Sequence, residues 1–391
     1  MVNYYLYPDD WAYKEDGSAP SVLDGTDGTV RVHTPKFYGK SGSNGNKRWV
    51  RISLVKLDDS WVEIPELLID AYRNTVDNTV SATPKAVSVV NTTEAFRGGG
   101  NRAQFDEYLT TELGTKDAFR SDLGKPRTNV SRANMRTYAT NAGSELLCYE
   151  YYKWIFYWNY VIEYANFNSQ AAYNAELTSD GYRQGGLGPG VTDWSNSATS
   201  WSGYNGTYPI TPCGYCNDIG NFTGIKDLVI PECTATNETD TVATKTFKVP
   251  RWRGFDNPFG DIWTNLDGVV IQRTAANEIS SVYTTTNKEE FTDVIGNKTI
   301  AGYEVAQDGH IKEFDLGETA EIIPSSCTGA STTTYMCDYH YCNTSYTALR
   351  TLQVGGRAYG GGVAGLGSFA SSSDVGSAGS AVGFRTLNRV S

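Results

Sequence analysis

Charged residues are scarce in this chain of 391 residues, because Asp, Glu, Lys and Arg together make up only 20% of it. Globular domains usually carry about a quarter of such residues, and Asn, Thr, Ser and Gly take their place here. The 33 basic and 44 acidic residues give a net charge of −11, which would repel a phosphate backbone. The balance is typical of a rigid, weakly charged surface protein, and we expect no nucleic-acid partner.

Long apolar runs are also lacking. The most apolar stretch runs from Trp154 to Ile162, far shorter than the ~20 residues that a membrane-spanning helix needs. The first residues, MVNYYLYPDDWAYKEDG, have neither the basic start nor the apolar run of a secretory signal peptide. We therefore expect a soluble protein without membrane insertion.

Recognisable catalytic motifs are absent too. The three histidines, His33, His310 and His340, stand in no Ser-His-Asp or metal-ligand motif. The runs GLGPG (186–190) and GGG (98–100) lack the Lys-Ser/Thr of a phosphate-binding loop. Paired carboxylates such as Glu289-Glu290 are typical of solvated faces, although a glycosidase, whose two carboxylates meet only in space, stays an open alternative. We expect no enzyme activity.

The chain has seven cysteines. Because this number is odd, they cannot all pair in disulfides within one chain. Cys213 and Cys216 could join Cys337, His340 or Cys342 in a zinc site. The spacing of the second group does not match the usual zinc ribbons, so buried free thiols are the favoured interpretation.

Two helices have clear local signals. Ser131 is a good N-cap, Met135, Tyr138 and Ala139 share one face, and Gly143 is a plausible stop. The second helix is expected over about 150–166. Its buried stripe would consist of Tyr151, Trp154, Trp158, Ile162 and Ala165. Aromatic residues are 13% of the chain, including 26 Tyr and 9 Trp, enough for a sizeable core.

The first 47 residues are expected to form a separate, small β-rich module. Asp, Gly and Pro punctuate them, and residues 29–33 alternate as a short strand would. A sustained strand pattern then begins at NGNKRWVRISLV, and IPELLIDAYRNTV forms a second strand region. The sequence thus predicts a module at 1–47 followed by a larger domain at 48–391.

The segment 355–385 has the most unusual composition, with 10 Gly, 6 Ser and 5 Ala among its 31 residues. A flexible linker would have this composition, but only six residues follow it, and apolar residues recur through it. These are Val354, Val363, Leu366, Phe369, Val375, Val382 and Phe384. We interpret the segment as ordered irregular backbone with an inward apolar row and an outward face of small residues.

Several motifs together resemble a known family. GFDNPFGDIWTNLDG, followed by VGGRAYGGGVAGLGSF and GSAVGFRTL, resembles the C-type-lectin fold in its formylglycine-generating-enzyme-like branch. ELLIDAYRNTV looks like the family's first strands, TNVSRANMRTYAT like its first helix and YYKWIFYWNYVIEYA like its second. The resemblance covers about residues 49–385. It implies an α+β C-type lectin fold with two helices, small antiparallel sheets and much irregular loop.

Within that branch the chain looks most like the variable proteins of diversity-generating retroelements, especially those of phages infecting gut Bacteroides-type bacteria. The resemblance implies that ten positions are variable and receptor-binding: Arg357, Tyr359, Gly360, Val363, Ala370, Ser372, Ser373, Ser377, Gly379 and Ala381. It also implies a constant frame between them, made of Gly355, Gly356, Ala358, Ala364, Gly365, Gly383, Phe384 and Arg385.

The function expected from this resemblance is that of a phage virion receptor-binding protein, an adhesin or fibre that recognises a bacterial surface glycan or protein. Arg357 and Tyr359 would dominate the contact energy, because Arg and Tyr are enriched in binding hot spots. The N-terminal module would attach to a virion structural protein, and a homotrimer would multiply weak single-site affinity. The alternative is a head- or tail-fibre decoration protein without a specific ligand.

Two further expectations concern chemistry in the same family. A formylglycine-generating oxidase would need a reactive cysteine pair in the C-terminal part of the domain, and no cysteine follows Cys342. No cofactor is expected. Asp261, Asn265 and Asp267 could hold a structural calcium, although turn capping explains these residues equally well.

Overall fold

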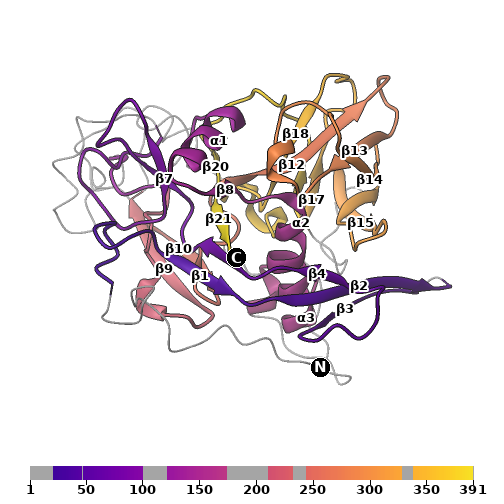
Figure 1. The fold of residues 1–391 in the computed structure, drawn as a ribbon, viewed down its shortest axis with the longest axis horizontal. Coiled ribbons are helices and arrows are strands. Elements are labelled where there is room, and N and C mark those ends of the chain that lie inside the picture. The colour runs from indigo at the N-terminus through magenta and orange to yellow at the C-terminus, as the bar shows by residue number, and fades with distance from the viewer. Residues whose placement is uncertain are drawn as a thin grey trace.

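The computed structural model describes residues 21–45, 47–99, 121–173, 210–231, 244–327 and 338–390. Antiparallel sheets dominate these residues, and two helical regions accompany them. The fold class is therefore α+β, as the sequence predicts, with strands providing most of the regular structure (Figure 1).

A four-stranded sheet joins the beginning of the described chain to its end. Its strands, in order, are β1 (Arg31–Thr34), β5 (Leu67–Asp70), β21 (Thr386–Arg389) and β8 (Glu145–Leu146). The last strand, β21, runs antiparallel to both neighbours, and Leu387 is opposite Ile69 on one side and Glu145 on the other. Both Leu387 and Ile69 are fully buried, so the C-terminal strand is part of the core.

The boundary expected after residue 47 is wrong for the described residues. Strand β2 (Phe37–Asn44) pairs with β3 (Lys47–Ser53) across a hairpin, and β4 (Val62–Ile64) joins the other side of β2. Together with the pairing of β1 and β5, this places residues 31–44 in sheets with later parts of the chain. Residues 1–20 lie outside the described residues. The β2–β3 hairpin projects from the body of the molecule (Figure 1).

A nine-stranded sheet carries most of the second half of the chain. Its continuous order is β14 (Thr299–Glu304), β13 (Ser280–Thr284), β12 (Trp263–Arg273), β18 (Arg350–Val354), β19 (Phe369–Ala370), β17 (Tyr339–Tyr341), β15 (Gly309–Asp315) and β16 (Ile323–Cys327), and β20 (Val382–Gly383) pairs with β12. The Val305 N–H, just after β14, donates to the Pro324 carbonyl in β16 at 2.9 Å. The two ends of the sheet therefore meet.

Two smaller sheets complete the strands. One has the order β11 (Phe255–Asp256), β10 (Thr244–Trp252) and β9 (Gly224–Pro231), and the other pairs β6 (Thr75–Asp77) with β7 (Lys85–Val87). The short 3₁₀ helices are η5 (Ala171–Tyr173), η6 (Asn217–Ile219), η7 (Lys288–Glu290) and η8 (Ala358–Val363).

Helix α1 (Arg132–Asn141) confirms the local prediction. The Ser131 side chain accepts a hydrogen bond from the Asn134 N–H, as an N-cap does. Met135 and Ala139 are buried against Phe384 and its neighbours. Gly143 follows the helix at φ 69°, the left-handed conformation that ends helices and that glycine adopts without strain.

The second helix is present but differs from the expected amphipathic stripe. It consists of α2 (Tyr149–Tyr152), a π-helical segment η4 (Lys153–Trp158) and α3 (Asn159–Tyr164). Residues 151–161 are all buried, whereas Ile162 and Ala165 of the expected stripe are partly exposed. The π-helical turns rotate later residues away from the expected face, and the helix is surrounded on all sides. None of the described helices is long and apolar enough to cross a membrane.

The core is aromatic around this second helix. Phe156 packs against Phe255 with ring centroids 4.5 Å apart, and Tyr160 packs edge-on against Trp252 at 5.5 Å. Such pairs add to the free energy gained from burial. Several of the described Tyr and Trp side chains thus fix this central helix against the sheets.

Candidate functional site

The C-terminal segment (residues 355–385) follows an irregular path between strands of the nine-stranded sheet and the final strand β21. It contains η8, then β19, a loop over residues 371–381, and β20. In Figure 1 it is the yellow end of the chain, which passes beside β18 before it returns to the centre of the molecule. The segment is ordered and not a linker, as its apolar residues predict.

Most of the predicted inward row is buried. Val354, Leu366, Phe369 and Phe384 are fully buried, and Val382 is nearly so. Val363 and Val375 of the same row are partly exposed. Trp263, the tryptophan of the GFDNPFGDIWTNLDG motif, is buried in one cluster with Phe384 and packs edge-on against Tyr341. The apolar residues therefore hold the segment as expected.

Three glycines of the segment have no room for side chains. A Cβ on Gly367 would come within 2.7 Å of both the Asp338 Oδ2 and the Tyr157 Cε2 atoms, and one on Gly365 would also collide with the Asp338 carboxylate. Gly383 is equally close to Ile262, at 2.6 Å. These glycines are required by the close approach of other parts of the chain.

Asp338 fixes the middle of the segment. Its Oδ2 accepts the Gly367 N–H at 2.7 Å, and its Oδ1 has no hydrogen-bond partner among the described residues. Burial without a neighbouring cation raises the pKa of Asp338 to about 7, and the Gly367 hydrogen bond opposes this shift only in part. A fully buried carboxyl group with such a pKa is half protonated near neutral pH.

A second buried carboxylate, Glu304 at the end of β14, supports the segment from the other side. It accepts hydrogen bonds from the Ser371 hydroxyl and, at 2.9 Å, the His340 Nε2 atom. Arg350 donates to it at 3.2 Å, and Arg273 completes an ion pair at 3.6 Å. Burial would raise the pKa of Glu304, but the hydrogen bond from His340 and the neighbouring positive charges outweigh it and lower the pKa.

Backbone carbonyls and amides of the segment are also held by side chains from far away. The Gln170 Nε2 donates to the Gly361 carbonyl at 2.7 Å and to the Ala364 carbonyl at 2.8 Å. The Leu366 N–H donates to the Ser169 hydroxyl at 2.8 Å. The irregular backbone thus satisfies its polar groups without a regular ladder.

The ten expected receptor-binding positions differ in how far they are exposed. Ser372 is exposed, and the partly exposed positions are Arg357, Gly360, Val363, Ser373, Ser377 and Gly379. The side chain of Tyr359 lies outside the described residues. Ala370 and Ala381 are buried at 4% and 6% exposure, so the expectation of an outward face is wrong for these two.

The burial of these two alanines has a direct cause. Ala370 lies in β19, and its side chain packs in one buried cluster with Trp263 and Phe384. The carbonyl of Ala381 accepts the Trp263 N–H at 2.8 Å, and its side chain packs with Ile262. A larger residue at either position would disturb the frame. Those of the ten expected positions that keep exposed surface and are described lie within 357–363 and 372–380.

The expected frame positions are all buried except Ala358, which is partly exposed. Arg385 is the clearest case, because its guanidinium donates to the Asp70 carbonyl at 2.9 Å and to the Asp256 carbonyl at 2.6 Å. It also lies 5.9 Å from the ring centroids of Phe156 and Phe255. Arg385 therefore joins the end of the segment to the central helix and to β11.

The three residues considered for calcium point to different partners. The Asp261 carboxylate accepts the Thr211 N–H at 3.3 Å, Asn265 accepts the Thr351 hydroxyl at 2.6 Å, and Asp267 pairs with Arg136 at 2.5 Å. Within the described ranges, no group of three or more His, Cys, Asp or Glu is placed to hold a metal ion.

The cysteines match the prediction of buried thiols where they are described. Cys148, Cys213, Cys216, Cys327 and Cys342 are free and buried, while Cys233 and Cys337 lie outside the described residues. Burial raises the pKa of Cys327 and of Cys342 to about 12. Thiols in this state are poor nucleophiles.

Ser371, His340 and Glu304 are joined by hydrogen bonds, a grouping that the sequence did not reveal. The side chains of His340 and Glu304 are fully buried, and Ser371 has no exposed surface. Of the other histidines, His33 contacts Glu66 at 2.7 Å and His310 packs against Tyr339. The hydrogen bonds of this group hold Ser371, and with it the segment, against β14 and β17.

Comparison with known proteins identifies no family, because neither a protein-family model nor a curated protein sequence matches the chain.

Proposed function

We propose that this protein is a non-enzymatic receptor-binding protein of a phage virion, an adhesin or fibre that recognises a bacterial surface glycan or protein through its C-terminal segment. The proposal includes a C-type lectin fold of the formylglycine-generating-enzyme-like branch. It also includes diversification of the exposed positions, a homotrimer, and attachment to a virion structural protein through the N-terminal residues.

The order of elements supports the lectin-like part of the proposal. Strands β5 and β6 occur where the resemblance places the first strands, α1 where it places the first helix, and residues 149–164 where it places the second. The motif at 254–268 leads into β12, which pairs with both β18 and β20 around the C-terminal segment. The parts of the chain that carry the resemblance are thus adjacent in space.

One observation carries the functional proposal: irregular backbone is fixed from within while small side chains remain outside. Asp338, Glu304, Gln170 and Arg385 hold the segment through buried contacts. Ser372 is exposed and takes no part in those contacts, while the adjacent Ser371 is buried and donates to Glu304. Binding residues are best placed on such loops above a rigid scaffold. Substitutions there change recognition while the free energy of unfolding stays within about 0.5 kcal/mol.

The test changes the exposed positions and leaves the frame intact. The labelled full chain carrying S372R and S377R is compared with the parent for adsorption to a panel of gut Bacteroides-type strains. The control, S43R with T137R, adds the same charge at the β2–β3 hairpin and at an exposed position of α1. We expect the parent and the control to adsorb to at least one strain, and the S372R/S377R variant to lose this adsorption.

The decoration alternative predicts another result. If the S372R/S377R variant is folded by circular dichroism and adsorbs as well as the parent, the C-terminal segment is not the recognition surface. If the parent itself adsorbs to no strain of the panel while virions assemble normally, the result would favour a decoration protein without a specific ligand.

A further inference from the structure

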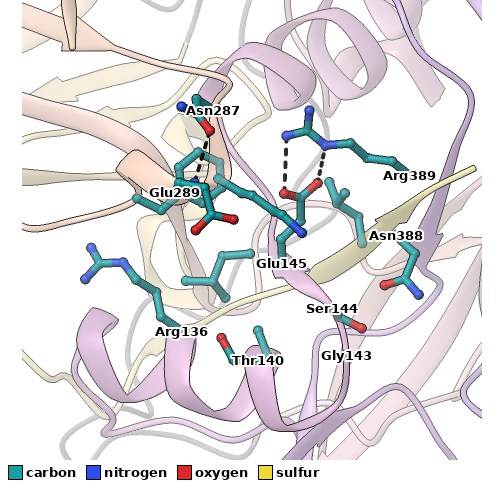
Figure 2. A pocket seen from close by; sticks show the side chains of 14 residues that line it. Arg136, Thr140, Gly143, Ser144, Glu145, Asn287, Glu289, Asn388 and Arg389 are labelled. Atoms are coloured by element: carbon teal, nitrogen blue, oxygen red, sulfur yellow. Dashed lines mark hydrogen bonds and ion pairs between the residues drawn. The ribbon is translucent and has the colours of Figure 1, made fainter. Parts of the chain in front are cut away.

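A surface pocket of about 690 Å³ lies outside the C-terminal segment, between the end of α1, β8, η7 and β21. Its volume is within the range of roughly 300–1,000 Å³ that is usual for small-molecule sites. Figure 2 shows Arg136 and Glu289 on one side, Glu145 and Arg389 on the other, and Thr140 and Ser144 from the helix end below. Four separate parts of the chain therefore contribute polar groups to one space.

An ion pair fixes one wall of this pocket. Arg389 donates from Nε to the Glu145 Oε1 at 2.6 Å and from its second nitrogen to Oε2 at 3.2 Å. The same guanidinium donates to the Thr286 carbonyl at 2.6 Å. Such a two-bonded pair holds both side chains in one orientation. The carboxylate and the guanidinium are thus presented to the pocket in a prepared geometry.

The opposite wall is fixed by a second network. Arg136 contacts Asp267 at 2.5 Å, and it also donates to Asp293. These two carboxylates outside the pocket balance the charge of Arg136. At the rim, the exposed side chains of Lys288 and Glu289 have opposite charges and make no ion pair within the described residues. The pocket as a whole is therefore polar and close to neutral.

The floor is apolar and belongs to the core. Ala139, Leu146 and Leu387 are buried beneath the polar groups, and the partly buried Phe291 lies at one edge. The amide of Asn388 and the hydroxyl of Ser144 add hydrogen-bonding groups beside Arg389. Because the three buried residues of the floor have almost no exposed surface, a ligand in this space would meet the partly exposed Phe291 as its apolar contact and donors and acceptors around the rim.

We propose that this pocket binds a neutral saccharide, as a mono- or disaccharide unit of a bacterial surface glycan. Each sugar hydroxyl both donates and accepts, whereas a carboxylate only accepts and a guanidinium only donates. Glu145 and Glu289 supply acceptors, Arg389 supplies donors, and the Thr140 hydroxyl can do both around one space. The C–H face of a sugar can pack on the partly exposed Phe291.

Charged ligands fit this arrangement less well. A phosphate or carboxylate ligand would be repelled by Glu145 and Glu289, and a metal cation by Arg136, Lys288 and Arg389. The pocket is separate from the exposed positions 357–363 and 372–380, so the inference does not depend on the proposed receptor-binding surface. It adds a second point of contact with a cell-surface glycan.

The test measures saccharide binding by saturation-transfer NMR on the full chain. The probes are maltose, cellobiose, lactose and N,N′-diacetylchitobiose. We expect at least one to bind with a millimolar dissociation constant. Thr140→Trp fills the pocket from an exposed helix position and should weaken this binding more than tenfold. Thr137→Trp, on the same helix but outside the pocket lining, is the matched control and should change it less than twofold.

Polar contacts are tested separately with variants that keep size. Glu289→Gln should weaken binding about threefold to tenfold, because a hydrogen bond to a charged group contributes about 1 kcal/mol or more. Glu313→Gln, an exposed position on β15, is the control. Binding by none of the four probes, or equal effects of Thr140→Trp and Thr137→Trp, would overturn the proposal.

The same probes distinguish this site from the C-terminal segment. The S372R/S377R variant should retain saccharide binding in the pocket even where its adsorption to cells changes. If S372R/S377R abolishes saccharide binding and Thr140→Trp does not, the sugar binds the C-terminal segment. That outcome would reject the pocket and support the proposed recognition surface.

Discussion

Two buried carboxylates hold the same C-terminal segment in opposite electrostatic surroundings. Glu304 accepts the Ser371 hydroxyl and is enclosed by Arg350, Arg273 and His340. Asp338 accepts the Gly367 N–H and has no ion pair within the described residues. Burial disfavours the charged form of both carboxyl groups, but only Glu304 has opposite charges nearby that offset this desolvation penalty. Its pKa is lowered, while the pKa of Asp338 is raised to about 7.

The difference shows that the frame does not depend on a single kind of contact. Glu304 acts as a charged centre that joins β14, β17 and β18 to Ser371. Asp338 acts through shape and one hydrogen bond, because it fills the space that Gly365 and Gly367 leave. Changes at these positions therefore have distinct effects on the free energy of unfolding and on its pH dependence.

The largest effect is expected at Glu304. Glu304→Gln leaves Arg350 and Arg273 buried without their counter-charge, which should lower the free energy of unfolding by about 3–5 kcal/mol. Glu313→Gln at an exposed position of β15 is the control and should change it by less than about 0.5 kcal/mol. Urea unfolding at pH 7 measures both. A loss below about 1 kcal/mol for Glu304→Gln would mean that the charged cluster does not hold the segment.

Asp338 should produce a pH dependence of the opposite sign to that of an ordinary carboxylate. Its pKa in the folded protein is about 7 and its usual value 3.8, so the folded state retains the proton between these values. Its stabilising contribution is complete below pH 3.8 and is lost as pH rises to about 7, at about 1.4 kcal/mol per pH unit.

Asp338→Asn removes this titration and keeps an oxygen that can accept the Gly367 N–H. Relative to this variant, the parent should lose about 2–3 kcal/mol of unfolding free energy between pH 5 and pH 7. Taking the difference between parent and variant at each pH cancels the titration of other groups. An identical pH profile for the two proteins would show that Asp338 is ionised over this whole range.

Gly367 tests the shape contribution without changing a charge. Gly367→Ala brings a Cβ to 2.7 Å from both Asp338 and Tyr157, and overpacking of this kind costs about 1–3 kcal/mol. Gly376→Ala is the matched control, because its nearest neighbour would be Asp374 at 3.4 Å and the position is exposed. Thermal unfolding compares the two. Equal midpoints would mean that the segment moves to accept the extra methyl group.

The smallest effect on stability is expected at Ser372, which is exposed and makes no side-chain contact with either carboxylate. Ser372→Ala should alter the free energy of unfolding by less than about 0.5 kcal/mol. A loss above 1 kcal/mol would place Ser372 in the frame and remove the distinction between a fixed interior and an open surface.

The sequence predicted the elements whose signals are local. Ser131 and Gly143 bound α1 as expected, because caps depend on residues within one turn. The inward positions of Leu366, Phe369 and Phe384 also followed from their apolar character. The α+β fold class, which the family resemblance implied, agrees with these local signals, since strand patterns and two helical segments are visible along the chain.

Features that depend on distant contacts were not predictable. Asp338 and Glu304 lie 29 and 67 residues from the groups they hold, and nothing in their own segments marks them as buried. The π-helical turns of 153–158 changed the face of the second helix. Ala370 and Ala381 were wrongly placed outside, because their burial comes from packing against side chains that are remote in sequence.

The central claim is that a fixed frame presents exposed positions whose identity sets recognition. The most direct measurement exchanges Ser372, Ser373 and Ser377 for other polar residues and records both the unfolding free energy and the set of bacterial strains that the chain binds. The account predicts an unfolding free energy within about 0.5 kcal/mol of the parent and a changed set of strains. A folded variant that binds the same strains with the same affinity would contradict it.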